Sequence, residues 1–423
     1  MNTRSDRSPA DRPFAARSSV DRSSADRSSA GEQRTAMAEA LAALPRVVDL
    51  LAARAEEHDR DATFPYQGIE AVHEAGLLTL TVGQRFGGQG GTLAETVRVL
   101  AELGRGDASV ALVTACTLLL HAEQERSARW PAAAYRRLLT ESRRGPALVN
   151  TLDAEPGRAQ QLRARRDGNG WLLTGRWSGC TGAEALAWMV VRAETDEPQP
   201  RTGLFLVRGE SPGVEVDPVW DQLGLRASAG HDVVFTEVEV PAEAALGLRP
   251  VQSETGPADS GAGPDPAAAA RTAWRDLALA AVQLGVGRAA RDWLVRFLNQ
   301  RTPANLAEPL GTLPRYQVAL GEVESALIGA EELVAGLAVR IDAGEAGALE
   351  RTGSAQLLVT RAVVDAVQRA VALTGSPGLS RRHPLERYLR DALSARQHGR
   401  CEDAVLAQAG RATLARATRS RGA

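Results

Sequence analysis

Apolar residues recur three and four positions apart between Ala36 and about Ala147, which is the spacing of one face of an α-helix. Two stretches show this spacing clearly, AMAEALAALPRVVDLLAARAEEHDRDATF and TLAETVRVLAELGRGD. Between them, FPYQGIEAVHEAGLLTLTVGQRFGGQGG predicts a short helix that stops at Gly76, followed by a glycine-rich loop. These glycines do not follow a strand as GxGxxG, so they give little support to a Rossmann fold. Residues 36–147 are therefore predicted to form a helical domain.

The pattern changes to that of β-strands from Leu148 to about Pro250. The segments are short, rich in β-branched and aromatic residues, and bounded by glycine, proline or aspartate. They include GWLLTGRWSGC, ALAWMVVRAE, TGLFLVRG and DVVFTEVEVP. Turns at roughly ten-residue spacing predict an antiparallel barrel or sandwich. Residues 148–250 are therefore predicted to form a middle β-domain, and residues 251–267, rich in glycine, proline and serine, a linker loop.

Helical spacing returns after Ala267 in three long amphipathic stretches, AWRDLALAAVQLGVGRAARDWLVRFLNQR, YQVALGEVESALIGAEELVAGLAVRIDAG and GSAQLLVTRAVVDAVQRAVALTG. Long helices with short connections predict a helical bundle over residues 268–420. The predicted fold class is therefore α+β, with helices, then strands, then helices. The first 35 residues are repetitive in arginine, serine and aspartate, and this composition predicts a disordered tail.

Composition narrows the functional classes. The chain has 423 residues, 44% of them hydrophobic, and a formal net charge of −2. Such a neutral balance argues against a protein that binds nucleic acid or a membrane surface, because phosphate binding requires a basic face. No apolar run approaches the roughly 20 residues that a membrane-spanning helix needs.

Two residue types exclude particular chemistries. The sequence contains no lysine, and both a pyridoxal-phosphate Schiff base and a Walker A phosphate loop require one. The three cysteines, Cys116, Cys180 and Cys401, form no CxxC or cysteine–histidine pattern. They therefore predict free thiols in a reducing cytoplasm and no zinc site.

Several stretches, taken in order, resemble the acyl-CoA dehydrogenase flavoprotein superfamily over about Phe64 to Arg411. The matching pieces are FP followed by IEAVHEAGLLTLTVGQRFGGQGG, then GRGDASVALVTACTLLLH, AEPG, GWLLTGRWSGCTGAEALAW, LGLRASAGHDVVFTEVEVP, VRFLNQRTPANLAEPLGTLPRYQ and PLERYLRDA. Each piece alone is weakly specific, but the shared order makes the resemblance specific. It implies an N-terminal helical domain, a middle β-domain and a C-terminal four-helix bundle, the layout that the periodicity indicates independently.

The resemblance also implies a cofactor and partners. Such enzymes hold FAD between the β-domain and the bundle and pass hydride from a substrate carbon to flavin N5. The substrate is expected to be an acyl thioester or a related small molecule. The redox partner would be an electron-transfer flavoprotein, a flavin reductase or O2. Family members pair so that bundles share the FAD site, which implies a homodimer or homotetramer.

The resemblance assigns flavin roles to individual residues. Thr181 falls where a hydroxyl lies near flavin N5, and Trp177 could replace the ring-packing tryptophan that is absent at Gly179. Ala154 stands where the family has a threonine before EPG. The remaining cofactor positions, at the nucleotide end, are Arg301, Gln317, Gly375, Ser376 and Gly378. Arg301 would reach the FAD pyrophosphate, often in the neighbouring subunit.

Substrate contacts are expected near Arg226 and Ser228, in a β-domain turn at the substrate mouth. His121 could line the same pocket, although such a histidine more often simply lies on a helix face. Arg387, Arg390 and Asp391 are expected to be structural and to take part in a buried ion pair between helices.

The catalytic base is the point at which the sequence departs from the family. Dehydrogenation of a thioester needs a carboxylate to remove the α-proton. Aligning PLERYLRDA without a gap places Gly399 where most family members have glutamate. A minority place the glutamate on the first bundle helix, where this chain has Arg275 with Asp276 beside it. Neither position therefore holds the usual glutamate.

Three explanations remain open for an enzyme. Glu402 or Asp403 could act as the base after a local shift. Alternatively, the chain resembles a flavin monooxygenase branch of the superfamily, which uses a C4a-(hydro)peroxyflavin and can place a histidine, here His398, beside the empty position. The third explanation is a base supplied elsewhere, such as Asp276, or altered chemistry.

An FAD-dependent, acyl-CoA dehydrogenase-like oxidoreductase is the leading prediction, with the monooxygenase as the alternative. A non-catalytic partner subunit of an active homologue is the non-enzymatic hypothesis. Catalysis is assigned to His398 and Glu402.

Overall fold

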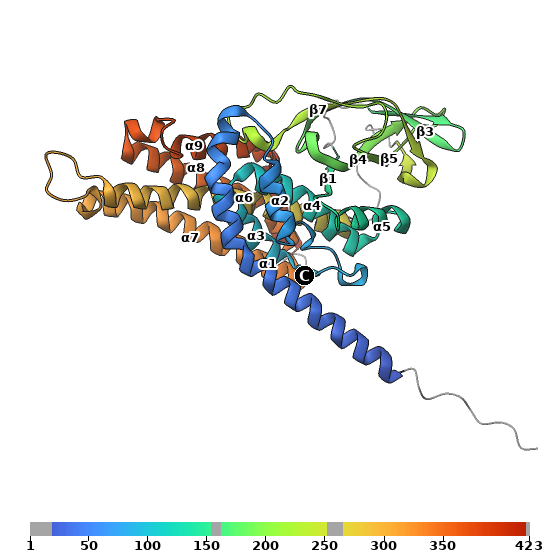
Figure 1. Cartoon of the computed structure of the whole chain (residues 1–423), viewed down its shortest axis with the longest axis horizontal. Helices are drawn as coiled ribbons and strands as arrows, with labels where there is room; N and C mark the ends of the chain where they lie inside the picture. The colour runs from blue at the N-terminus through green and yellow to red at the C-terminus, as the bar shows by residue number, and fades with distance from the viewer. Residues whose placement is uncertain (1–18, 154–161, 252–264, 420–423) are drawn as a thin grey trace, which may run out of the picture.

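The computed structural model describes residues 19–153, 162–251 and 265–419, and in it helices from both ends of the chain pack together beside a single sheet (Figure 1). The N-terminal helices are α1 (Ser19–Asp61), α2 (Tyr66–Glu74), α3 (Leu93–Gly106), α4 (Ala108–Ser127) and α5 (Ala132–Glu141). The C-terminal helices are α6 (Pro266–Gln300), α7 (Pro314–Asp342), α8 (Thr352–Thr374), α9 (Leu385–Ser394) and α10 (Glu402–Arg419). The predicted α+β fold class is confirmed.

Local signals fix the ends of the two central N-terminal helices. Thr92 caps α3, because its hydroxyl accepts the backbone N–H of Glu95 while the Glu95 carboxylate accepts the N–H of Thr92. Asp107 separates α3 from α4, and its carboxylate accepts the N–H groups of Ser109 and Val110. Each cap satisfies backbone donors that have no partner within the helix. These caps divide one long apolar run into two helices.

Within the described ranges, eight strands form one sheet of order β6-β7-β3-β2-β4-β5-β8, with β1 paired to β4. Their bounds are β1 (Leu148–Leu152), β2 (Arg163–Asp167), β3 (Gly170–Cys180), β4 (Leu186–Thr195), β5 (Arg201–Arg208), β6 (Val214–Asp217), β7 (His231–Pro241) and β8 (Ala245–Pro250). The sheet is mixed, because β1 and β2 both run parallel to β4. The sequence had predicted an antiparallel sheet.

The two parallel pairs arise because β1 and β2 lie beside successive parts of β4. β1 pairs with residues 186–191 of β4, and β2 then pairs with residues 194 and 195 in the same direction. The two short strands thus lie end to end along one neighbour before β2 turns back into β3. Ala154 belongs to residues 154–161 between them, and lies outside the described residues. Strand periodicity carries no information on direction, so the sequence could not reveal this arrangement.

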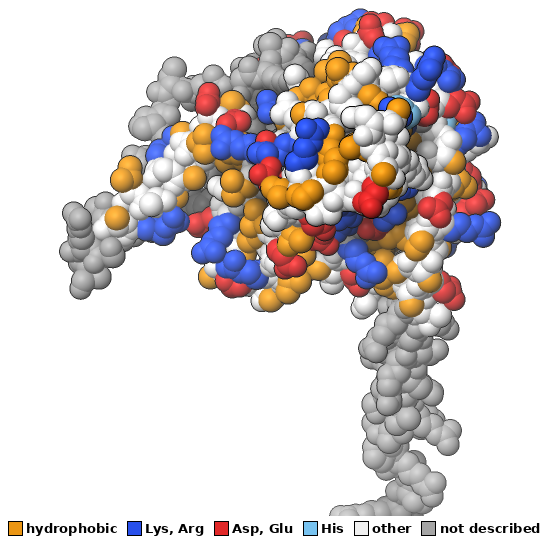
Figure 2. Space-filling model, turned by 90° about the vertical axis from the view of Figure 1, so that its left-hand side faces the viewer, with side chains coloured by type: hydrophobic (Ala, Val, Ile, Leu, Met, Phe, Trp, Pro, Cys, Tyr) orange, Lys and Arg blue, Asp and Glu red, His pale blue; other side chains and the backbone are white. Residues whose placement is uncertain are grey.

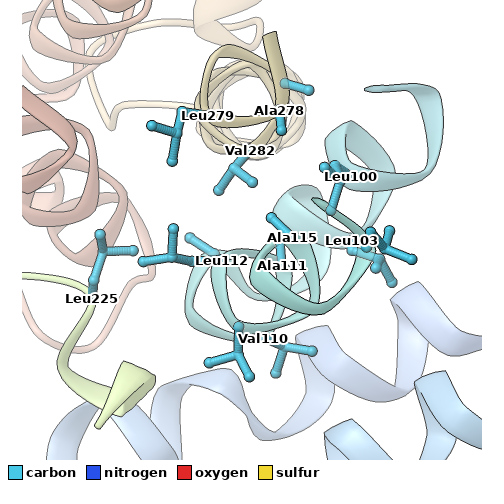
Figure 3. Close-up of a cluster of buried hydrophobic side chains, with 14 of the residues drawn as sticks. Leu100, Leu103, Val110, Ala111, Leu112, Ala115, Leu225, Ala278, Leu279 and Val282 are labelled. Carbon is cyan, nitrogen blue, oxygen red and sulfur yellow. The ribbon is translucent and has the colours of Figure 1, made fainter. Parts of the chain in front are cut away.

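The core lies where α3, α4 and α6 meet (Figure 3). Leu100 and Leu103 of α3, Ala111 of α4 and Val282 of α6 are buried there. Leu225, from the turn before β7, packs against the same cluster. The β-domain therefore shares one hydrophobic core with the helices that flank it.

Two glycines allow α3 and α6 to cross at close range. A Cβ atom on Gly285 would lie 2.3 Å from the Ala101 carbonyl oxygen, and one on Gly104 would lie 2.5 Å from the Val282 carbonyl oxygen. Both distances are far below van der Waals contact and involve backbone atoms, so neither position admits a side chain in this arrangement. The crossing fixes α6 against the N-terminal domain.

Helices α6 and α8 run parallel, with a constant offset between facing residues. The hydroxyl of Thr352 donates to Oδ2 of Asp276 at 2.9 Å, and a Cβ on Gly287 would lie 3.2 Å from Val363. Both contacts join residues 76 apart in sequence. Residues that face each other across these helices can therefore be read from that offset.

Helix α1 begins at Ser19, so it covers residues 19–35, which the sequence analysis assigned to a disordered tail. Extending an existing helix fixes one residue for each hydrogen bond, whereas starting one fixes several. A segment that would not form a helix alone can therefore continue one that the protein core stabilises. Residues 1–18 of the predicted tail lie outside the described residues, as do 252–264 of the predicted linker.

Arginine and acidic side chains are interspersed on the face shown in Figure 2, without a large region of one sign. None of the helices among the described residues has both the length and the apolar character required to cross a membrane.

Candidate active site

The end of β3 holds Thr181 in a tightly fixed turn. The side-chain amide of Asn150 donates to the Thr181 carbonyl at 3.0 Å. The next residue, Gly182, has φ 76°, a left-handed conformation that favours glycine, and its N–H donates to the carbonyl of Ser228 at 2.8 Å. A Cβ on Gly182 would lie 3.5 Å from Val113 of α4. The half-buried Thr181 is therefore held between the sheet and α4.

Ser228 supports this turn from behind. It ends a short 3-10 helix (Arg226–Ser228) and is completely buried, and its hydroxyl has no hydrogen-bond partner among the described residues. Its backbone carbonyl is the acceptor for Gly182. The serine predicted as a substrate contact thus reaches the site through its backbone.

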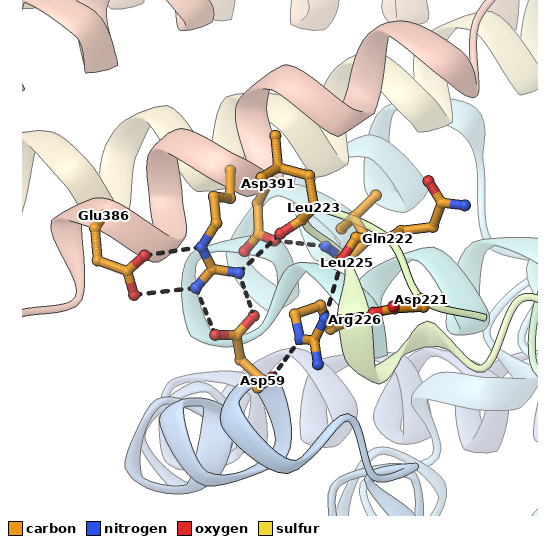
Figure 4. A network of polar contacts seen from close by, with 9 residues as sticks. Asp59, Asp221, Gln222, Leu223, Leu225, Arg226, Glu386 and Asp391 are labelled. Carbon is orange, nitrogen blue, oxygen red and sulfur yellow. Dashed lines mark hydrogen bonds and ion pairs between the residues drawn. The ribbon is translucent and has the colours of Figure 1, made fainter. Parts of the chain in front are cut away.

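Arg226 ties the same turn to α1, and Figure 4 shows the contacts. Its Nε donates to the carbonyl of Asp59 at 2.9 Å, and its Nη1 donates to the carbonyl of Gln222 at 3.1 Å. Nearby, the N–H of Leu225 donates to Asp391 at 2.7 Å. These bonds place Arg226 in the junction between α1, α9 and the β-domain.

Trp177 and His121 are both buried among apolar side chains. Trp177 faces the main core from β3, where it pairs with Val233 of β7. His121 of α4 is 2.9 Å from the Tyr135 hydroxyl through Nδ1, and its Nε2 has no partner among the described residues. Burial lowers the pKa of His121 to about 4, so the ring is neutral at pH 7.

Arg275 lies close enough to two polar groups from other elements to influence their ionisation. The positive charge of Arg275, on α6, acts to lower the pKa of Cys116, on α4. It acts in the same direction on the pKa of His398, which follows α9. Burial raises the pKa of Cys116 to about 11, and the Arg275 guanidinium only partly opposes this. Cys116 in turn acts on Cys180, the last residue of β3. The end of β3, α4, α6 and the turn at residue 398 therefore define one candidate active site.

His398 is held as a neutral imidazole. Its Nδ1 lies 3.3 Å from the carbonyl oxygen of Ser394, a contact that requires a proton on Nδ1 and leaves Nε2 as an acceptor. Burial lowers the pKa of His398 below its usual value, and the positive charge of Arg275 acts in the same direction. An imidazole with a free Nε2 lone pair can accept a proton from a bound molecule.

The Asp276 side chain points in a different direction from that of Arg275. It is buried, accepts the Thr352 hydroxyl at 2.9 Å, and lies 3.9 Å from Nη1 of Arg400. Arg275 and Asp276 are adjacent, so their side chains leave α6 about 100° apart. The carboxylate therefore belongs to the contact between α6 and α8.

Glu402 starts α10 and forms an ion pair with Arg361, with about half of its side chain (51%) exposed. We expect Glu402→Gln to leave the kcat of flavin reduction or turnover within about twofold of wild type, and the free energy of unfolding within about 1 kcal/mol, because exposed ion pairs contribute little. Stopped-flow kinetics and urea unfolding measure the two quantities. A loss of kcat beyond tenfold with an unchanged fold would restore Glu402 as the base.

The remaining residues that the sequence predicted to bind the cofactor lie at the opposite end of the bundle. Arg301 caps the C-terminus of α6, Gln317 lies in the first turn of α7, and Gly375 caps α8 ahead of a 3-10 helix (Ser376–Leu379) that contains Gly378. Gln317 donates to the carbonyl of Gly311 at 3.0 Å. Because α6 rises 1.5 Å per residue, Arg301 lies about 39 Å along the helix from Arg275. One flavin molecule could not contact both Arg275 and Arg301 of the same chain.

The groups around Thr181 fit the ring of a flavin. The Thr181 hydroxyl can donate or accept, and the adjoining Gly179 is exposed, with no atom near the position of a Cβ. Flavin ring nitrogens and carbonyls form hydrogen bonds with such donors and acceptors. The thiol of Cys116, which burial keeps protonated, adds no negative charge at this edge.

The chain matches two family models, described as the acyl-CoA dehydrogenase N-terminal domain over residues 34–130 and the acyl-CoA dehydrogenase C-terminal domain over residues 277–402. YdbM of Bacillus subtilis (strain 168), named as an acyl-CoA dehydrogenase, is 28% identical over 371 residues, which are 85% of this chain and 93% of YdbM. The amino sugar nitrososynthase RubN8 of Streptomyces rubradiris is 30% identical over 378 residues, which are 85% of each chain.

A solved structure has the same fold. KijD3 in complex with FMN and dTDP-3-amino-2,3,6-trideoxy-4-keto-3-methyl-D-glucose superposes with a TM-score of 0.76 and 26% identity, over 90% of this chain and 94% of KijD3.

Proposed function

The chain belongs to the acyl-CoA dehydrogenase family, and on that premise we propose that it is a flavin-dependent monooxygenase that uses a histidine in place of a carboxylate base. The observation that carries this proposal is the charge of the site. Gly399 and Arg275 stand at the two positions where the resemblance places the glutamate, so one position is neutral and the other is positive. An arginine guanidinium stays protonated and has no acceptor, so it cannot remove an α-proton.

His398 is the group that would handle a proton in this reaction. Its Nδ1 faces the Ser394 carbonyl, so Nε2 is the atom that would take a proton from the substrate or return it. The lowered pKa keeps His398 in the basic form at neutral pH. Arg275, whose charge acts on His398, would favour negative charge that develops on the substrate.

Thr181 would hydrogen-bond the flavin ring, and the bundle-end residues would bind the cofactor's phosphates. Because Arg301 lies about 39 Å along α6 from Arg275, we propose that Arg301, Gln317 and the Gly375 turn serve the flavin of a neighbouring copy in a homodimer or homotetramer. When bound and reduced, the flavin supplies the electrons that activate O2. Of the two flavins, FAD would make more contacts with Arg301, Gln317 and the Gly375 turn. FMN is the cofactor named for KijD3.

The expected redox partners are therefore O2 and a flavin reductase. The named activity of RubN8 and the ligand of KijD3 make amino sugar nucleotides the first substrates to test. The second candidate function is oxidation of an acyl thioester with an electron-transfer flavoprotein as acceptor. The similarity to YdbM over most of both chains favours it.

The two candidates differ in how the flavin is reduced. Protein loaded with flavin is mixed anaerobically with butyryl-CoA or octanoyl-CoA, and the flavin absorbance is followed. We expect no bleaching by the thioesters, but bleaching by NADH with a flavin reductase, followed by incorporation of one ¹⁸O atom into an amino sugar or another polar substrate. Complete anaerobic bleaching by an acyl-CoA would overturn the monooxygenase proposal in favour of dehydrogenation. A protein that binds neither FAD nor FMN would be the non-catalytic partner subunit.

Arg275→Gln is expected to raise the pKa of His398, because removal of the cation leaves only burial to oppose protonation of the imidazole. Imidazole proton resonances, followed by NMR across pH 4–8, measure this pKa directly. Arg271→Gln is the matched control, since Arg271 lies one turn earlier on α6 and pairs with Glu123. If the pKa of His398 is unchanged in Arg275→Gln, Arg275 does not act on His398 and is not part of the candidate active site.

A further inference from the structure

The space beside Gly399 is filled by an amide from another helix. A Cβ atom built on Gly399 would lie 2.1 Å from Nε2 and 2.8 Å from Oε1 of Gln356. Gln356 belongs to α8, whereas Gly399 lies in the turn before α10. A glutamate at 399 would leave the backbone in this direction, so the first atoms of such a side chain would compete with the Gln356 amide. The glycine and the glutamine therefore form a matched pair.

The Gln356 side-chain amide forms no hydrogen bond with the other residues that the structure describes. The residue is only 4% exposed, and the hydroxyl of Thr360 donates to its backbone carbonyl at 2.9 Å. The nitrogen and oxygen of this side-chain amide are not among the fully buried side-chain atoms without a partner, so they keep some contact with solvent. An amide in this position can form hydrogen bonds with a molecule bound beside it.

The turn that carries His398 and Gly399 is fastened directly against α8. A Cβ on Gly353 would lie 2.7 Å from Nη1 of Arg400, so the absence of a side chain at 353 is what admits the guanidinium. The same Nη1 lies 3.9 Å from Oδ2 of Asp276. Gly353 and Gln356 are three residues apart and hence lie on one face of α8. The Arg400 contact thus sets the position of Gly399 over the Gln356 amide.

We infer that Gln356 presents its side-chain amide to the substrate at the position that Gly399 leaves open, and that the substrate carries a neutral polar group, such as an amine or a hydroxyl, at its reacting atom. This inference rests on the proposed function. An amide donates and accepts hydrogen bonds at once, so it can hold either group. It does not titrate, so it positions the substrate and leaves proton transfer to His398.

Cysteine accessibility tests the direction of the side chain without any turnover. Gln356→Cys, Val359→Cys and Gln368→Cys are treated with iodoacetamide, and alkylation is followed on the tryptic peptides, which contain no natural cysteine. On the same helix, Val359 is fully buried and Gln368 is exposed. The alkylation rates of these two variants therefore give the lower and upper limits for comparison. We expect Gln356→Cys to react at least tenfold faster than Val359→Cys, and to be protected when flavin is bound. A rate equal to that of Val359→Cys would overturn the inference.

Kinetics test the role of the amide. Gln356→Met keeps the volume but loses the hydrogen bonds, so we expect KM for a polar substrate to rise about tenfold with the thermal midpoint unchanged. Gln368→Met is the matched control and should leave KM unchanged. An unchanged KM in Gln356→Met overturns the inference, whereas rapid, flavin-protected alkylation without any oxygen transfer would overturn only the monooxygenase proposal.

Discussion

Replacement of His398 by glutamine is expected to lower kcat about 100- to 1,000-fold, because general acid–base catalysis contributes on that order. The wild-type kcat/KM should rise with pH through a pKa below 6.5, since burial and Arg275 lower the pKa of His398 in the free enzyme and only the neutral imidazole accepts a proton. This rising limb should be absent from the His398→Gln profile. Steady-state oxygen consumption across pH 5–9 measures both effects.

The control for this prediction is His383→Gln. His383 lies against Trp293, with ring centroids 5.5 Å apart, and its variant should keep the wild-type pH profile. If His398→Gln retains kcat within threefold while binding flavin normally, the histidine is structural, and the proton must be transferred by the substrate itself or by water.

Replacement of Arg390 by alanine is expected to lower the free energy of unfolding by about 3–5 kcal/mol, because it leaves buried carboxylates without their counter-ion. The guanidinium donates to both oxygens of Asp59, at 2.9 and 2.6 Å, and to both oxygens of Glu386, at 2.8 and 3.0 Å. Only 13–16% of each of the three side chains is exposed, so water can replace the lost bonds only in part. Figure 4 shows Asp59 and Glu386 on either side of this junction. Chemical denaturation followed by circular dichroism measures the change.

Arg369 provides the comparison, since it also bridges two carboxylates, those of Asp365 and Glu322. The three side chains are 46–56% exposed, so Arg369→Ala should change the free energy of unfolding by less than about 1 kcal/mol. Arg390→Lys should be nearly as unstable as Arg390→Ala, because one ammonium cannot form two bidentate pairs. Equal effects of Arg390→Ala and Arg369→Ala would show that the junction between α1 and α9 contributes no more than a surface contact.

Much of the fold could be predicted from periodicity alone. The change from helical spacing to strands near Leu148, and back to helices after Ala267, matches the order of elements in the structure. The direction of β1 and β2 could not be predicted, because parallel and antiparallel strands share the same alternation. The helix over residues 19–35 was missed because local composition does not report the stabilising continuation into the core.

Only part of the candidate active site could be predicted from the sequence. The resemblance identified Gly399 and Arg275 as the positions without a carboxylate, and that contrast carries the proposed function. Gln356 was missed because it stands within GSAQLLVTRAVV, where apolar neighbours make the stretch look like an ordinary core helix. A signal was present, since Thr352, Gln356 and Thr360 recur every four residues and so lie along one buried face of α8. Their contact with residue 399 depends on the tertiary fold.

The glycine crossing of α3 and α6 has a consequence for how the molecule opens. Because the backbones of Gly104 and Gly285 touch those of the opposite helix directly, no side chain between them can move aside to let one helix unfold alone. The two helices should therefore exchange their amide hydrogens as one cooperative unit, at the rate set by global unfolding. The amides of α10, which has mostly exposed residues, should exchange earlier through local fraying.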